Sequence, residues 1–125
     1  MIDIFRSSKA NKNTKIISHT YDYFTIRNIK DKKDKSSRQK ALEGHGVPRI
    51  YWKQIVTHMN QALSDALFSF NDPAKNIYIV RTIDTLVPAD EQEPGNTKHW
   101  RNEIHPNEDG YIKLGHDKIN AYLVH

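Results

Sequence analysis

The sequence contains no cysteine in 125 residues and only five glycines and five prolines. The lack of thiols excludes disulfide frameworks, cysteine nucleophiles and metal centres held by cysteine. No apolar run is long enough to span a bilayer, and residues 1–15 lack the apolar core of a signal peptide. We therefore expect a cytoplasmic protein that does not associate with membranes. The length predicts a single domain over residues 1–125.

The net charge of +4 comes from one short segment. Residues 30–40 hold six basic and two acidic side chains, and the rest of the chain carries equal numbers of each. This segment contains no aromatic residues on which bases could stack, so we expect no nucleic-acid binding. A solvated loop is the favoured interpretation, and a phosphate-binding patch is the alternative.

Hydrophobic patterning predicts two strands and two helices. Short apolar, β-branched runs at 15–21 and 76–81 are typical of buried strands, and the second has the continuous apolar character of a parallel sheet. A helix is predicted over 49–70, because apolar residues recur there at intervals of three and four. We expect this stripe, including Trp52 and Met59, to lie in the core. A second helix is predicted from Pro106 to Val124, with Tyr111 and Leu114 on its inner face.

This order of elements predicts an α/β fold with one right-handed crossover and a packing helix. The predicted fold is incomplete, because two strands cannot cover the apolar stripes of both helices. Either residues 1–14 contribute more to the fold than their sequence indicates, or the chain needs a partner segment, for which the edge strand that carries Ile16 and Ile17 is the expected docking position. Residues 26–49 form a long charged connection between the first strand and the first helix.

His105 is the candidate for acid–base chemistry. It precedes Pro106 at the start of the last predicted helix, near the carboxyl ends of the strands, where open α/β sheets place their sites. Asn102 and Glu103 are close enough in sequence to orient the Nδ1 nitrogen, as a working general base requires. Taken alone, such a histidine is more often a surface or cap residue.

The segment around His105 resembles the last sequence block of the SGNH (GDSL-like) hydrolases. That block has the pattern Asp-x-x-His-Pro, a few residues, glycine and then a helix; the corresponding residues here are Asn102, His105, Pro106, Gly110 and Leu114. Trp100 stands two residues before Asn102, as in one variant of the block. The strand and turn over 16–23, the helix with Trp52 and Asn60, and the strand over 76–86 fit the same family. The resemblance implies the C-terminal half of a flavodoxin-like, three-layer α/β/α domain, without its N-terminal strands.

The resemblance also implies that half of the catalytic site is missing. His105 would be the base that accepts the proton of a catalytic serine, and Asn102 stands where the family has aspartate. An amide can bind Nδ1 but cannot stabilise an imidazolium, and Glu103 is the candidate substitute carboxylate. The family's Gly-Asp-Ser nucleophile and the two other blocks that form its oxyanion hole do not occur here. No serine in the chain follows Gly-Asp.

Three further residues are candidates for substrate binding. His19 and Asp22 lie at the end of the first predicted strand and would line the same cleft, as the matching turn does in the family. The alternative is a strand-end histidine capped by a neighbouring carboxylate. Trp100 is the third candidate. A zinc site formed by His99, His105 and His116 is not expected, because their spacing differs from that of zinc-binding helices.

Two hypotheses of function follow. The first is a serine esterase half that acts on a small-molecule ester without metal or organic cofactor, and is inactive until an N-terminal half of the same hydrolase docks. The second is a non-catalytic interaction module that self-associates, or that binds an acidic partner through residues 30–40.

Overall fold

The computed structural model describes residues 2–92 and 97–123. Two four-residue strands, β1 (Ile16–His19) and β2 (Ile77–Val80), pair in parallel, with Ile16 opposite Ile77. Helix α3 (Trp52–Phe68) connects them, because parallel strands need a crossover that returns the chain to the same end of the sheet. These findings confirm the mixed α/β class, both predicted strands and the helix between them.

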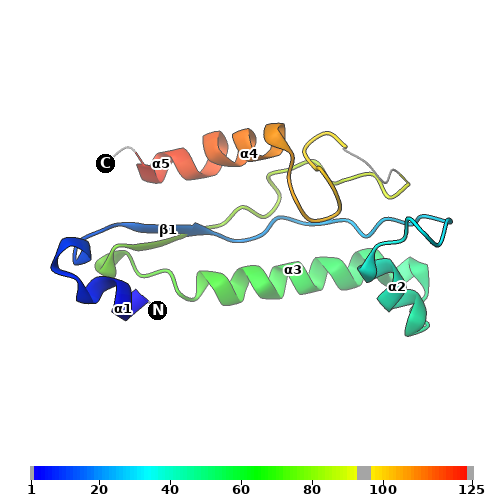
Figure 1. The fold of residues 1–125 in the computed structure, drawn as a ribbon, viewed down its shortest axis with the longest axis horizontal. Helices are drawn as coiled ribbons and strands as arrows, with labels where there is room; N and C mark the ends of the chain where they lie inside the picture. The colour runs from blue at the N-terminus through cyan, green and yellow to red at the C-terminus, as the bar shows by residue number, and fades with distance from the viewer. Residues whose placement is uncertain (1, 93–96, 124–125) are drawn as a thin grey trace.

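Helices lie on both sides of this small sheet (Figure 1). The ring of Tyr78 in β2 lies 5.9 Å from that of Tyr122 in the C-terminal helix α5 (Asn120–Leu123). Arg81, three residues further along, instead places its guanidinium 4.1 Å from the ring centroid of Phe68 in α3. Because successive side chains of a strand point to opposite faces, the two contacts show that α3 and α5 cover different faces.

The predicted C-terminal helix is interrupted. It consists of α4 (Glu108–Leu114), a π-helical turn at Gly115–Ile119, and α5. The side chain of Asn107 caps α4 by accepting a hydrogen bond from Gly110 N at 3.0 Å. Leu114 is buried as predicted, but Tyr111 is 54% exposed, so its assignment to the inner face was wrong. None of the helices in the described residues is long and apolar enough to cross a membrane.

The 26–49 connection is more structured than predicted. It contains α2 (Ser37–Gly44) and ends where a 3₁₀ turn, Arg49–Tyr51, leads into α3. Ser36 Oγ caps α2 by accepting from Gln39 N at 3.1 Å. The buried amide of Gln39 bonds both backbone groups of Ile29, which ties the helix to the preceding strand-like segment. A further short helix, α1 (Ile2–Ser7), precedes β1.

The buried face of α3 differs from its apolar face. Trp52 and Val56 are buried as predicted, but the next two buried positions are the polar residues Asn60 and Ser64. Met59 is 59% exposed, so the prediction that it lies in the core was wrong. The predicted stripe therefore enters the core only over its first turns.

Two hydrophobic clusters share Phe24. One contains Ile26, Trp52 and Val56 near the start of α3, and the other is formed by Leu86, Ala89, Trp100 and Leu114. Phe24 packs against both. Both clusters therefore lie around the segments that follow β1 and β2, whereas the buried Ile77 and Val80 lie within β2 itself.

Asp22 holds these two segments together. Its carboxylate is buried and accepts hydrogen bonds from the backbone N–H groups of Asp84, Thr85 and Leu86 at 2.8, 2.9 and 2.6 Å. A fourth bond comes from Tyr23 N at 2.7 Å. Thr20 and Thr82 are fully buried and bonded to each other just before this point. The pairing that begins in the sheet thus continues through side chains after the strands end.

We expect Asp22→Asn to lower the free energy of unfolding by about 2–3 kcal/mol. An amide would turn an NH2 group toward backbone donors that now bind a carboxylate oxygen. Urea denaturation followed by circular dichroism measures the loss. Asp84→Asn is the control, because Asp84 is exposed and asparagine tolerates its positive φ of 61°. Equal stability of the two variants would contradict this role for Asp22.

Candidate active site

The loop that carries His105 is anchored by Trp100. Only 1% of the Trp100 surface is exposed, and its indole N–H donates to the carbonyl of Val87 at 2.8 Å. The backbone N–H of each of Trp100 and Thr97 donates a hydrogen bond to the carbonyl of the other. The N–H of Arg101 donates to the carbonyl of His105 at 2.8 Å. Trp100 therefore belongs to the core and supports the loop from inside, whereas we had expected it to contact substrate.

His105 is held beside Asn102 at the exposed tip of this loop. Asn102 Oδ1 accepts from the backbone N–H groups of Ile104 and His105 at 3.0 and 2.9 Å, which identifies it as the oxygen of the amide. The same oxygen lies 3.2 Å from His105 Nδ1. The amide nitrogen of Asn102 lies equally close, 3.1 Å from Nδ1, so the contact positions the ring without fixing which ring nitrogen carries the proton. The predicted pairing of His105 with Asn102 is present.

Glu103 is committed to other partners. Its buried carboxylate accepts from Arg27 N at 2.7 Å and from Ser36 Oγ at 2.8 Å, and it lies 3.6 Å from a guanidinium nitrogen of Arg38. These contacts fasten the His105 loop to the segment before α2. Among the described contacts, the Glu103 carboxylate is bonded to Arg27, Ser36 and Arg38 and not to the imidazole of His105.

His19 and Asp22 do not join His105. The Nδ1 nitrogen of His19 lies 2.7 Å from the carbonyl oxygen of Thr20, and the Asp22 carboxylate is occupied by four backbone N–H groups. Asp22 is 4% exposed and so has no free surface for a ligand. The expected roles of both residues in substrate binding have no support in this geometry.

A cavity of about 330 Å³ lies next to His105. Asn102 and Ile104 line it from the loop, and Arg27, Ser36, Ser37 and Arg38 line it from the other side. Ser36 Oγ bonds Glu103 and caps α2, while Ser37 is exposed. Among the described residues, no serine hydroxyl is hydrogen-bonded to His105. The structure thus places a histidine beside a cavity, and no serine of the described residues is bonded to it.

The start of α2, around Ser36, was not identified from the sequence as part of this site. Ser36 and Gln39 have the Ser-x-x-Gln spacing of a helix-capping box, which signals a helix start at α2. That signal could have been found in the sequence. The contact between Ser36 and Glu103 could not, because 67 positions separate the two residues.

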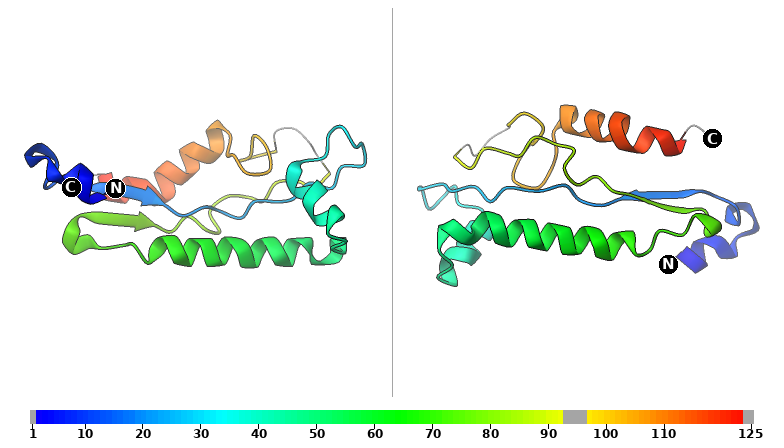
Figure 2. Two further views of the ribbon diagram at one scale, coloured as in Figure 1. Left: turned by 60° about the horizontal axis from the view of Figure 1, so that its bottom comes forward. Right: turned by 180° about the vertical axis from the view of Figure 1, so that it is seen from behind.

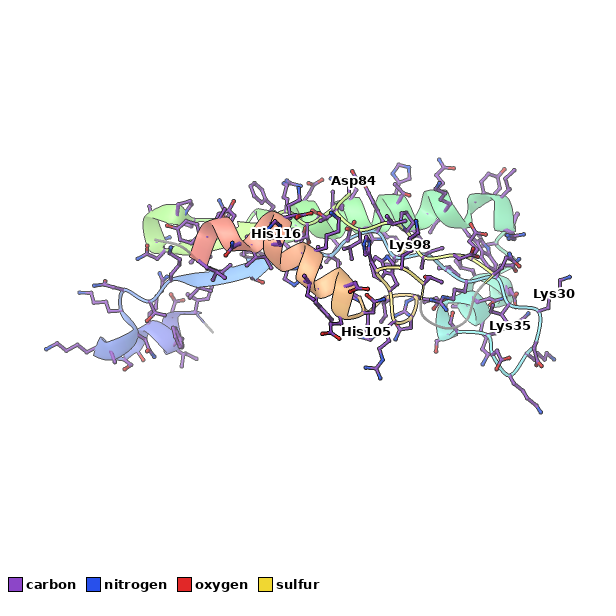
Figure 3. All side chains as sticks on the ribbon, turned by 90° about the horizontal axis from the view of Figure 1, so that it is seen from above. Lys30, Lys35, Asp84, Lys98, His105 and His116 are labelled. Atoms are coloured by element: carbon purple, nitrogen blue, oxygen red, sulfur yellow. The ribbon has the colours of Figure 1, made fainter. Side chains whose placement is uncertain are left out.

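A larger cavity of about 890 Å³ lies between the first half of α3 and residues 84–91. Tyr23, Trp52 and Asp84 line it, and none of the six predicted site residues does. Burial, with the negative charges of Asp84 and Asp22, raises the pKa of the Tyr23 hydroxyl. The hydroxyl donates to Gln61 at 3.2 Å. Figure 3 shows Asp84 and His105 well apart, so this cavity is separate from the His105 site.

The three histidines considered for a metal site have separate partners. His99 Nδ1 accepts from Val87 N at 2.9 Å, and His116 Nδ1 lies 2.9 Å from Asp117. Hydrogen bonds from Lys113 and His116 lower the pKa of Asp117 to about 2. Within residues 2–92 and 97–123, no cluster of three histidine or acidic side chains could hold a metal ion.

Comparison with known proteins identifies no relative: no family model, curated protein or solved structure matches the chain.

We expect Gly110→Ala to lower the free energy of unfolding by about 1–3 kcal/mol. A methyl group at Gly110 would overlap the carbonyl oxygen of His99, which accepts the backbone N–H of Asn107 at 2.9 Å. Gly115→Ala is a matched control in the same helical arm, because nothing lies within 4 Å of its added methyl group. That change should stabilise the chain by about 0.5–1 kcal/mol. Thermal unfolding distinguishes the two, and a stable Gly110→Ala variant would contradict this packing.

Proposed function

We propose that this chain supplies the histidine half of an SGNH (GDSL-like) esterase site in a flavodoxin-like domain of the cytoplasm. The observation that carries the proposal is the His105–Asn102 pair, fixed on an exposed turn beside a cavity. The turn directly precedes a capped helix, as in the sequence block that the segment resembles. The serine nucleophile would come from another polypeptide segment, the N-terminal half of the same hydrolase.

The proposed reaction is acyl transfer from a small-molecule carboxylic or carbohydrate O-acyl ester. His105 Nε2 takes the proton of the incoming serine hydroxyl while the serine oxygen attacks the ester carbonyl. The imidazolium then returns that proton to the leaving alcohol. Water repeats the sequence on the acyl-enzyme and releases the acid. The proposal requires no metal or organic cofactor.

Asn102 limits how well this base can work. Its oxygen orients the ring, but a neutral amide does not stabilise the positive charge that forms on His105. The equivalent loss of charge in a serine protease lowers kcat about 10⁴-fold. Because Glu103 faces Arg27 and Ser36, no other carboxylate compensates within the described loop.

A second candidate is an interaction module without catalysis. It is favoured by the occupied carboxylate of Glu103 and by the large apolar side chains that remain exposed on α3, Met59, Leu63 and, just beyond it, Phe70. On this hypothesis the chain would bind a partner or self-associate without hydrolysing an ester.

The chain alone should hydrolyse p-nitrophenyl acetate no faster than its His105→Ala variant, because no nucleophile is bonded to His105. Co-expression with the segment encoded upstream of Met1 should produce activity that His105→Ala abolishes. Ser37→Ala is the control, since Ser37 lines the same cavity. Activity of the isolated chain that Ser37→Ala removes would show a nucleophile within the chain and refute the split site.

In that complex, we expect Asn102→Asp to raise kcat by at least ten-fold, toward the ~10⁴-fold effect of restoring the carboxylate. The aspartate can keep both backbone hydrogen bonds of Asn102. Asn120→Asp is the control, because it adds the same charge at an exposed position in α5. An unchanged or lower kcat with Asn102→Asp would mean that His105 does not act as the base.

A further inference from the structure

The cavity of about 890 Å³ beside α3 has no role in the proposed function. We call it the α3 cavity. Its volume lies within the range of about 300–1,000 Å³ that is usual for small-molecule sites. Ile26, Trp52, Val56 and Ala89 line it and are each buried, and Phe24, which packs against both hydrophobic clusters, lines it as well. The cavity is therefore preformed, because its base is the packed core.

Two sides of the α3 cavity are the helix itself and the segment that follows β1. Figure 2 shows this extended segment running alongside α3. The two run in opposite directions, because Tyr23 bonds Gln61 at 3.2 Å, whereas Ile26, further along its segment, packs with Trp52 at the start of the helix. One end of the cavity therefore lies at Tyr23 and the other near Trp52. With a rise of 1.5 Å per residue, Trp52 and Gln61 are about 14 Å apart along the helix.

The segment that follows β2 forms the third side and runs in the same direction as the segment after β1. Tyr23 N and Asp84 N donate to the same oxygen of Asp22, at 2.7 and 2.8 Å. Further along both segments, Asn28 N donates to the carbonyl of Glu91 at 2.6 Å. Asp84 therefore lies at the same end of the cavity as Tyr23, and Glu91 lies at the other end.

The charges at the Glu91 end are balanced. Arg49 and Glu91 both line the cavity, and their side chains form an ion pair at 2.7 Å. The other cation of the lining is Lys53, which is exposed. Its Cα lies eight residues before Gln61, or about 12 Å along the helix, which exceeds the Debye length of about 8 Å at physiological ionic strength. Lys53 therefore opposes a cation near Tyr23 less than an adjacent carboxylate attracts it.

The Tyr23 end presents two hydrogen-bond acceptors. Gln61 Nε2 donates to the Asp65 carboxylate at 3.2 Å, which identifies its amide oxygen as the acceptor of the Tyr23 hydroxyl proton. The lone pairs of the Tyr23 oxygen therefore remain able to accept. Burial, and then the charge of Asp84, raises the pKa of this hydroxyl, so it stays a neutral phenol. Within residues 2–92 and 97–123, the Asp84 carboxylate forms no hydrogen bond or ion pair. A positively charged hydrogen-bond donor would satisfy both acceptors at once.

We infer that the α3 cavity binds a small aromatic amine, with its ammonium group between Asp84 and the Tyr23 oxygen and its ring on Phe24 and Trp52. The unpaired carboxylate favours a cation, and the aromatic side chains of the lining favour a flat ring. A cation beside Tyr23 also gains from the negative face of the phenol ring. This site is separate from the His105 cavity, and its ligand is bound rather than hydrolysed, so it goes beyond the proposed esterase site.

Three compounds with the same phenyl group test this site: 2-phenylethylamine, phenylacetate and the neutral 2-phenylethanol. The chain has two tryptophans, and Trp52 lines the cavity whereas Trp100 does not, so their indole N–H signals in NMR spectra report where a compound binds. At low ionic strength the amine should shift the Trp52 signal with a Kd at least ~10-fold lower than that of phenylacetate. The alcohol should lie between them. Tighter binding of phenylacetate, or no shift of the Trp52 signal by the amine, would overturn the inference.

A charge variant locates the ammonium group. Asp84→Asn should weaken binding of 2-phenylethylamine about five-fold and leave that of 2-phenylethanol unchanged. Asparagine tolerates the positive φ of 61° at this position, so the variant removes only the charge. Asp90→Asn is the matched control, because Asp90 is exposed in the same segment and does not line the cavity. An equal effect of the two variants would indicate attraction by net charge alone and would overturn the inference.

A cavity-filling variant tests where the ring lies. Thr57 lines the middle of the α3 cavity and is exposed, so Thr57→Phe should fill part of the space and weaken the amine and the alcohol at least ~10-fold. His58→Phe adds the same ring at the next position of α3, which is exposed and does not line the cavity, and should leave both affinities unchanged. Circular dichroism verifies that both variants are folded. Unchanged binding of the amine by a folded Thr57→Phe variant would place the ligand elsewhere and overturn the inference.

Discussion

The Asp22 carboxylate accepts four backbone N–H groups just after β1, and the arrangement of the rest of the molecule depends on these bonds. They hold residues 84–86, which follow β2, beside the residues that follow β1, although the two strands are only four residues long. The carbonyl of the next residue, Val87, accepts a hydrogen bond from the Trp100 indole N–H, and its backbone N–H donates one to His99 Nδ1. One buried charge thereby links the sheet to the loop that carries His105.

The His105 loop is held from two directions. Trp100 bonds Val87 in the segment after β2. Glu103 bonds Arg27 and Ser36 in the segment between β1 and α2. In the proposed function, rigid support of this kind would keep His105 in position for a general-base role, because little ordering would be needed when the substrate arrives. The same contacts occupy the Glu103 carboxylate. Its charge holds the loop in place, and removing it from that role would leave buried N–H and hydroxyl groups unpaired.

The apolar face and the buried face of α3 do not coincide. A helix packed on a full sheet buries its apolar stripe, but α3 buries Asn60 and Ser64 and exposes Met59 and Leu63. Two strands are too narrow to cover the wider apolar surface.

The sequence by itself determined the local elements, because periodicity and capping act over a few residues. It predicted both strands, α3, the C-terminal helix and the pairing of His105 with Asn102, whose residues are three positions apart. It also contained the capping pattern of α2, Ser36 followed by Gln39. Only the tertiary structure decided the long-range contacts of Asp22, Trp100 and Glu103, because the partners in those contacts lie between 13 and 76 positions away in the chain. Hydropathy could not show which side of α3 is buried, since that depends on the number of strands available to cover it.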